Sequence, residues 1–236
     1  MADESDSERP EAPAGDNATL PVRYLDRTAR WGAWALPVWS VLLFLATATH
    51  QPDPRTDFAE FARYVTTTQF LISHIVASII GAAIGVLGLL ALFTFLALRV
   101  RSSLTLAGLA MAVVGNVMIA AVFGTAAFGQ SALGRLYLAG QTEQAVATYN
   151  DMYGAPLSAT AAAGVLLLVI GVVVLGIKVA RVRLLPSWAG IGMAAGIVVF
   201  GVIGVILADF VQSIGAALLV VSTVWLAYGA KRAPDP

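Results

Sequence analysis

The chain contains no cysteine in its 236 residues. Disulfides, thiolate metal ligands and cysteine nucleophiles are therefore excluded. Charge is also scarce, because Asp, Glu, Lys and Arg make up only 12% of the residues and their formal charges cancel to zero. A protein that binds nucleic acid needs an excess of Lys and Arg on one surface. The composition thus gives no support to a nucleic-acid partner.

Motifs that carry chemistry are missing as well. The sequence has no phosphate-binding P-loop, no nucleophile elbow and no HExxH zinc motif. The acids of the predicted outer loops, with His50 and His74, match no recognised metal-binding loop, and a bis-histidine haem site would need both histidines. We therefore predict that the protein is not an enzyme and has no catalytic residue, no metal site and no cofactor.

Long apolar runs dominate what is present. Hydrophobic residues make up 58% of the chain, against roughly 45–50% in a soluble domain, and the mean hydropathy is +0.82. These values predict an all-α polytopic protein of the cell membrane, surrounded by the lipid bilayer. Six spans are expected, at about residues 31–48, 69–98, 104–128, 158–177, 188–208 and 211–229. None of them carries Asp, Glu, Lys or Arg, which disfavours ion-coupled transporters and proton pumps.

The sequence also predicts two terminal tails and a sharp turn between the last two spans. Residues 1–22 are rich in Asp, Glu, Ser and Pro and predict a disordered acidic tail, and residues 233–236 form a short second tail. From Trp188 to Tyr228 the apolar run would form about 60 Å of helix, twice a bilayer core, so it must reverse. The polar segment 209–213 predicts the hairpin. Residues 46–48 resemble a signal-peptide cleavage site, but the preceding run is too long for a usual signal, so cleavage is the less favoured alternative.

Two short amphipathic helices are predicted in the outer loops. Asp57 followed by Glu60 is typical of a helix cap, and Phe58, Phe61 and Val65 then recur at helical spacing. In the longest connection, residues 142–153 form a second helical pattern that ends before a glycine and a proline.

Positive charge is distributed unequally between the two sides of the predicted bundle. One side carries ten cations, namely Arg23, Arg27, Arg30, Arg99, Arg101, Lys178, Arg181, Arg183, Lys231 and Arg232. The other side carries three, Arg55, Arg63 and Arg135, with six acids. Cytoplasmic loops are the ones enriched in Lys and Arg, so both termini are predicted to be cytoplasmic.

Small residues form two stripes at helical spacing. The second span places on one face His74, Ser78, Gly81, Gly85 and Gly88, and the third span repeats at every fourth position Gly108, Ala112, Asn116, Ala120 and Gly124. Small residues let helix backbones approach closely in lipid. These glycine-rich seams predict close contacts with a neighbouring helix, with a membrane-protein partner or with a second copy of the chain.

His74 leads the list of candidate ligand-binding residues. About 37 Å of helix separate it from Arg99, more than the roughly 30 Å of a hydrocarbon core, so it is expected at the outer lip. Further candidates at a similar depth are Gln130, Asp209 and Gln212, and Asn116 lies near mid-depth. A polar side chain of this kind either contacts a ligand or bonds a neighbouring helix, and the sequence favours the structural role for both His74 and Asn116.

The segment Arg183–Gly192, RLLPSWAGIG, contains an LLP-x-W pattern at the start of the fifth span. It resembles the entry to the penultimate helix in several uncharacterised bacterial six-span membrane families. The resemblance implies a six-span layout with a long outer loop between the third and fourth spans. It brings no catalytic residues.

Two functions remain open at this point. The favoured hypothesis is a non-catalytic bundle in the cytoplasmic membrane that acts through a membrane partner or lipid. The alternative is a carrier or receptor for a small apolar or zwitterionic molecule, bound in an outward-facing cleft near His74. A cavity beside His74 would favour the alternative.

Overall fold

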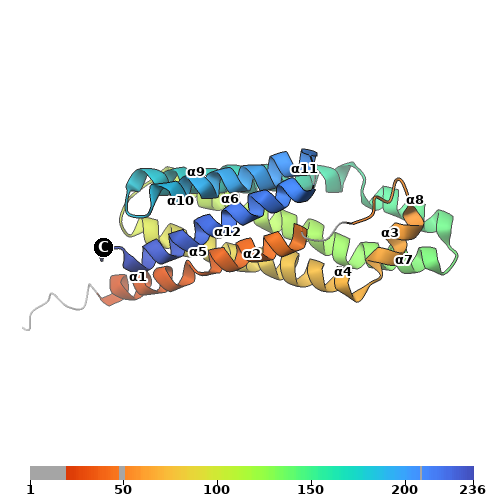
Figure 1. Cartoon of the computed structure of the whole chain (residues 1–236), viewed down its shortest axis with the longest axis horizontal. Helices are drawn as coiled ribbons and strands as arrows, with labels where there is room; N and C mark the ends of the chain where they lie inside the picture. Colours follow the sequence, from red (N-terminus) through yellow and green to blue (C-terminus); the bar gives the residue numbers. More distant parts are fainter. Residues whose placement is uncertain (1–19, 48–50, 208) are drawn as a thin grey trace, which may run out of the picture.

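The computed structural model describes residues 20–47, 51–207 and 209–236, and for Asp209 only the backbone. Every regular element in these residues is a helix, which confirms the all-α prediction. The helices lie along one long axis (Figure 1). Six of them are long and apolar enough to cross a membrane, and each covers one of the six predicted spans.

The six long helices are built from shorter segments. The first joins α1 (Leu20–Gly32) to α2 (Ala35–Thr47), and the second joins α4 (Thr68–Ile72), the π-helix η1 (Ser73–Ile80) and α5 (Gly81–Ala97). The third joins α6 (Ser103–Gly124), the π-helix η2 (Thr125–Gln130) and α7 (Ser131–Leu138). The last three are α9 (Ala155–Val182), then α10 (Ser187–Val198) with the π-helix η3 (Val199–Ile203) and α11 (Gly204–Leu207), and finally α12 (Asp209–Arg232).

Several predicted boundaries were wrong. The first helix begins at Leu20 and not at residue 31, so the last three residues of the predicted tail are helical, while residues 1–19 lie outside the described part. This helix is interrupted between Gly32 and Ala35. Pro37 occupies the first turn of α2, where a missing N–H removes no helical hydrogen bond.

The third helix and the hairpin also differ from the prediction. Helix continues through Gly129 and Gln130 to Leu138, ten residues beyond the predicted end at 128. Residues 209–213 are the beginning of α12, so the chain reverses before them.

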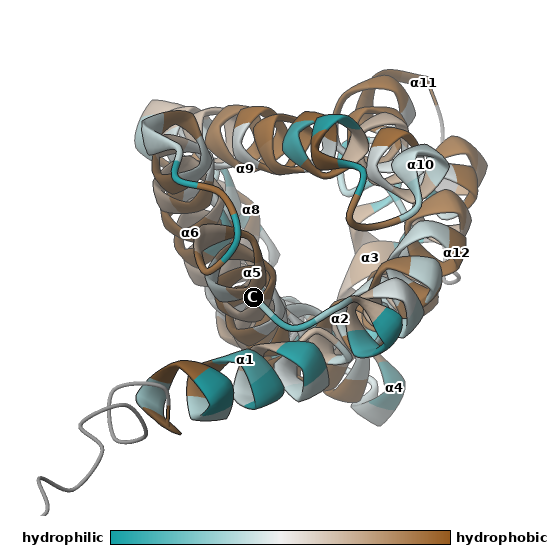
Figure 2. Cartoon of the chain, turned by 90° about the vertical axis from the view of Figure 1, so that its left-hand side faces the viewer, coloured by the Kyte–Doolittle hydropathy of each residue, from teal (hydrophilic) through white to brown (hydrophobic). Residues whose placement is uncertain are grey.

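The long helices form a closed ring, which Figure 2 shows end-on. Around the ring α6 packs on α9, α9 on α10, α10 on α12, α12 on α2, α2 on α5, and α5 on α6. A single core of buried apolar side chains, including Leu36, Leu92, Leu175 and Leu219, links these helices.

The predicted glycine seam of the second helix contacts α2 of the same chain. A Cβ on Gly85 would lie 2.9 Å from the indole of Trp39, and a Cβ on Gly88 would lie 2.8 Å from the backbone nitrogen of Leu36. Both distances are below ordinary carbon contacts, so the two backbones approach closely because these positions are glycine. The seam is thus used inside the ring.

The third helix uses its small residues against α9. A Cβ on Gly108 would meet Val174, and a Cβ on Gly115 would meet the backbone of Leu168. Only part of the predicted stripe of small residues therefore contacts α9. Gly124 belongs to the stripe, but a Cβ there would meet nothing within 4 Å.

At one end of the ring, called here the terminal end, both described termini meet (Figure 1). The buried carboxylate of Asp26 accepts hydrogen bonds from Arg30 at 2.6 Å and from Arg99 at 2.7 Å. Arg30 also donates to the carbonyl oxygen of Ala233, at 2.5 Å. This ion cluster joins α1, α5 and the segment after α12.

The opposite end, the loop end, carries α3 (Phe58–Val65) and α8 (Thr142–Met152), packed on α7. Both predicted amphipathic helices are therefore confirmed as helices. The predicted cap is present too, because the carboxylate of Asp57 accepts a hydrogen bond of 2.8 Å from the backbone N–H of Glu60. The aromatic rings of Phe58, Phe61 and Tyr149 pack edge to face between these helices.

Candidate functional site

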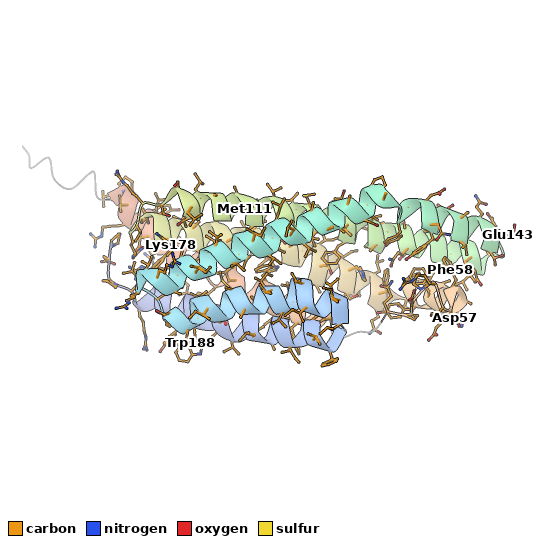
Figure 3. The ribbon with its side chains drawn as sticks, turned by 90° about the horizontal axis from the view of Figure 1, so that it is seen from above. Asp57, Phe58, Met111, Glu143, Lys178 and Trp188 are labelled. Atoms are coloured by element: carbon orange, nitrogen blue, oxygen red, sulfur yellow. The ribbon has the colours of Figure 1, made fainter. Side chains whose placement is uncertain are left out.

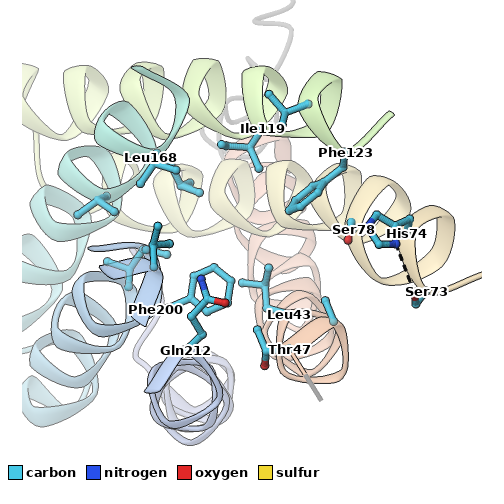
Figure 4. A pocket seen from close by; sticks show the side chains of 17 residues that line it. Leu43, Thr47, Ser73, His74, Ser78, Ile119, Phe123, Leu168, Phe200 and Gln212 are labelled. Carbon is cyan, nitrogen blue, oxygen red and sulfur yellow. Dashed lines mark hydrogen bonds between the residues drawn. The ribbon is translucent and has the colours of Figure 1, made fainter. Parts of the chain in front are cut away.

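A cavity of about 280 Å³ lies inside the ring, in the half that faces the loop end (Figure 4). Its volume is just below the roughly 300–1,000 Å³ typical of small-molecule sites. Every long helix contributes to its wall. The lining residues are Leu43, Ala46, Thr47, Ser73, His74, Ser78, Ile119, Val122, Phe123, Val165, Leu168, Val169, Ile197, Phe200, Gly201, Val205 and Gln212.

Most of this wall is apolar. Leu168, Val169 and Ile197 are buried in this wall, and Phe123 and Phe200 contribute aromatic rings to it. None of the lining residues is Asp, Glu, Lys or Arg. A ligand enclosed here meets no formal charge, so the wall suits an uncharged, largely apolar molecule.

A few polar side chains also line the cavity. They are Ser73, His74 and Ser78 of η1, Thr47 of α2 and Gln212 of α12. Thr47 and Ser73 are already bonded, since their hydroxyls donate to the backbone carbonyls of Phe44 and Phe70, both at 2.9 Å. Within the described residues, the hydroxyl of Ser78 and the amide of Gln212 have no hydrogen-bond partner.

The hydrogen bonds of His74 define its tautomer. Nδ1 lies 3.0 Å from the carbonyl oxygen of Phe70, and a carbonyl oxygen only accepts, so Nδ1 carries the proton. In the neutral imidazole Nε2 is then an acceptor, and it has no partner in the described part of the chain. The imidazole stacks at 4.1 Å on the ring of Phe70, which fixes its orientation, and Figure 4 shows it beside Ser78.

Two of the three π-helices supply cavity residues. Ser73, His74 and Ser78 belong to η1, and Phe200 and Gly201 belong to η3. A π-helix widens the turn and shifts the direction of the side chains that follow, and such segments occur often at functional sites. Because η1 lies between α4 and α5, it turns the polar face of the second helix into the cavity.

Gln212 is held in place by the hairpin of α11 and α12. A Cβ on Gly204 would lie 2.6 Å from the backbone nitrogen of Gln212, so only glycine allows this approach. The hydroxyl of Ser213 donates to Thr47 Oγ1 at 2.9 Å, which ties the start of α12 to the end of α2. These contacts bring Gln212 to the same cavity as His74.

Asn116 does not line the cavity. It is buried, and its Nδ2 donates a hydrogen bond of 2.8 Å to the carbonyl oxygen of Ala82. The amide thus joins α6 to α5, which is the structural role that the sequence favoured.

Gln130 is also separate from the cavity. It is buried beneath the loop end, where its amide nitrogen donates to the hydroxyl of Tyr153 and its oxygen accepts from Gln51 at 3.3 Å. Burial raises the pKa of Tyr153 to about 12, against a smaller opposing effect of the hydrogen bond from Gln130. Gln130 therefore anchors the loop-end helices to the third long helix.

The last candidate ligand-binding residue, Asp209, and the second histidine, His50, cannot be placed at the cavity. The side chain of Asp209 and the whole of His50 lie outside the described residues. Within the described ranges, no group of three or more His, Asp or Glu is placed to hold a metal ion. Of the five candidates, the structure thus brings together His74 and Gln212.

Sequence reasoning missed Thr47, Ser73 and the apolar wall of the cavity. Ser78 had a visible signal, because it follows His74 by four residues on the predicted seam.

Comparison with protein-family models, curated proteins and solved structures finds no match to this chain.

Proposed function

We propose that the protein spans the cell membrane six times, with its terminal end in the cytoplasm. Lys178 and Trp188 lie at the terminal end, whereas Asp57 and Glu143 lie at the loop end (Figure 3). The excess of Lys and Arg at the terminal end supports this orientation. The similarity of residues 183–192 to bacterial six-span families stays a prediction.

Within this topology, the proposed function is that of a carrier or receptor for a small uncharged amphiphile, bound in the cavity beside His74. One observation carries the proposal: within the described residues, three polar groups of a mostly apolar cavity have no hydrogen-bond partner, namely Nε2 of His74, the hydroxyl of Ser78 and the amide of Gln212. Small-molecule sites combine apolar walls with a few convergent polar groups in this way. The open Nε2 of His74 accepts from a hydroxyl of the ligand, and the amide of Gln212 both donates and accepts.

Binding to a membrane-protein partner through the glycine seams has less support. The seam of the second helix contacts α2, and Gly108 and Gly115 contact α9, so a partner would need a different face. The non-catalytic role is part of the same proposal, and it is supported by a cavity lining that carries no Asp, Glu, Lys or Arg.

The test uses the small neutral probe 1-aminoanthracene and the full-length protein in mild detergent. The fluorescence of the probe should rise on binding and saturate at one site per chain. Leu168→Trp fills the cavity and should remove the signal, because Leu168 is buried in its wall. The matched control is Leu166→Trp, which lies two residues away on α9 with its side chain 58% exposed.

Thermal unfolding of both variants shows whether each is folded. If Leu168→Trp unfolds, Ser78→Val is used instead, because it removes the hydroxyl of Ser78 from the cavity and adds little volume. Equal saturable binding in a folded cavity variant and in the control contradicts the proposal.

A further inference from the structure

The wall of the cavity is incomplete between α9 and α11. α9 and the helix formed by α10, η3 and α11 pack closely at the terminal end, where Figure 3 labels Lys178 and Trp188, and they diverge toward the loop end. At η3 they still touch, since a Cβ on Gly201 would lie 2.9 Å from Val169. Beyond η3 the chain turns away, and α11 packs on η3 and α12 instead.

Val205 of α11 marks the opening. It lines the cavity, yet its side chain is 63% exposed. A residue with one side on a cavity and the other on the surface stands at the edge of an entrance. Val165 of α9 lines the cavity on the opposite side of this gap.

The surface around the opening is apolar. Leu166 of α9 and Val202, Ile203, Ile206 and Leu207 on the other side are all exposed. About 27 Å of helix separate Ser187 from Val205, within a hydrocarbon core of roughly 30 Å. An opening at this depth with this rim faces lipid chains, so water is not the medium from which a ligand enters.

Polarity inside the cavity changes along the bundle axis. His74, Thr47 and Gln212 lie toward the loop end. About 34 Å of helix separate His74 from Ala97, which is the terminal end of the second long helix. The apolar Ile197 is closer to the terminal end, because only about 15 Å of helix separate it from Ser187, where the fifth long helix begins. A lipid in the loop-side leaflet has the same order, with its polar head toward the loop end and its chain toward the centre of the bilayer.

From these relationships we infer that the ligand is a single-chain membrane amphiphile with an uncharged, hydroxyl-bearing head, which enters sideways from the bilayer between α9 and α11. The hydroxyl donates to Nε2 of His74, and the chain lies against Leu168, Ile197 and Phe200. A charged head would lose its hydration without gaining a counter-charge. This inference rests on the proposed function, because it concerns the same cavity.

The test measures how fast the cavity fills. Full-length protein in phosphatidylcholine nanodiscs is mixed with vesicles that carry 1-hexadecanol with a diazirine in its chain, and samples are flashed at intervals. Mass spectrometry of the peptides then gives the fraction of protein labelled at the cavity wall. Two quantities result, the rate of filling and the final occupancy.

Three variants separate the entrance from the site. Val205→Trp narrows the entrance and should slow the approach to its own final occupancy about tenfold or more, because roughly 1.4 kcal/mol of barrier gives that factor. Ile206→Trp is the matched control, since Ile206 is 75% exposed and does not line the cavity, and it should fill at the wild-type rate. Leu168→Trp should abolish the final occupancy.

The outcomes are distinguishable. Filling of Val205→Trp at the wild-type rate, with normal occupancy, overturns the sideways entrance and leaves the proposed function standing. Absence of cavity labelling in the wild type, with 1-aminoanthracene still bound, overturns the lipid ligand alone, and loss of both signals overturns the proposed function. A diazirine-bearing palmitic acid should reach at least tenfold lower occupancy at pH 8 than the alcohol, and equal occupancy contradicts the uncharged head.

Discussion

Nδ1 of His74 lies 3.0 Å from the carbonyl oxygen of Phe70 in the preceding helical turn. This hydrogen bond places the proton on Nδ1 and leaves Nε2 as an acceptor at the cavity. Replacing His74 with Phe keeps the ring and removes the acceptor, and we expect 1-aminoanthracene to bind about fivefold more weakly, the effect of one hydrogen bond of about 1 kcal/mol. Fluorescence titration measures this, with Gln69→Leu, an exposed polar position on α4, as the control.

Asn116 should affect stability and leave ligand binding unchanged. Asn116→Leu removes the hydrogen bond to the carbonyl oxygen of Ala82, and we expect a loss of roughly 1 kcal/mol in the free energy of unfolding. Unfolding in mixed micelles measures the change. A large loss of 1-aminoanthracene binding in folded Asn116→Leu contradicts the separation of this residue from the cavity.

Gly85 should not tolerate a larger side chain. Gly85→Leu forces a branched chain against the indole of Trp39 and should cost about 1–3 kcal/mol or more. Gly124→Leu is the matched control, because a Cβ there meets nothing within 4 Å. Equal melting temperatures for the two variants would show that α2 and the second long helix are not packed as described.

Breaking the ion cluster of the terminal end should strongly lower the free energy of unfolding. Asp26→Asn leaves the buried guanidinium of Arg99 without its carboxylate, and loss of one partner of a buried pair costs about 3–5 kcal/mol. Asp53→Asn breaks the exposed pair with Arg55 and should cost far less, because solvent screens an exposed ion pair. Chemical unfolding of both variants gives the comparison.

Tyr153 should titrate later than an ordinary tyrosine. Its pKa of about 12 in the folded protein exceeds the usual value near 10, so the folded state holds this proton more tightly than the unfolded state does. The resulting stabilisation is present in full below pH 10 and is lost as the pH rises from 10 through 12. Tyrosinate absorbance at 295 nm should lose its latest step in Tyr153→Phe, and an unchanged titration curve would contradict the burial of this hydroxyl.

The number of long helices was predictable because each has a run of apolar residues of membrane length. The caps of the loop-end helices were predictable as well, since Asp57 and Glu60 are local signals. The joint approach of His74 and Gln212 was not, because it depends on the π-helix η1 and on the reversal before Asp209. The polar segment 209–213 indicated a reversal near this point, but the widened turn of η1 leaves no pattern in sequence hydropathy. The continuation of the third helix to Leu138 was missed because Gly129 and Gln130 are ordinarily signs of a helix end.

The divergence of α9 and α11 is a property of packing. Gly176 and Gly190 lie at the close contact between α9 and α10, where a Cβ on Gly176 would lie 3.1 Å from Ala194. The glycines of the fifth helix also face α12, however, and the sequence does not say which neighbour each one meets. A cavity formed where six helices separate therefore requires the three-dimensional arrangement.

The most direct measurement is native mass spectrometry of the full-length protein purified from its host membrane in mild detergent. The wild type should carry one small neutral molecule, Leu168→Trp should carry none, and Leu166→Trp should carry the same molecule as the wild type. A wild type that carries nothing, even after incubation with the diazirine-bearing 1-hexadecanol, or an identical adduct on folded Leu168→Trp, would contradict a ligand site in the cavity beside His74.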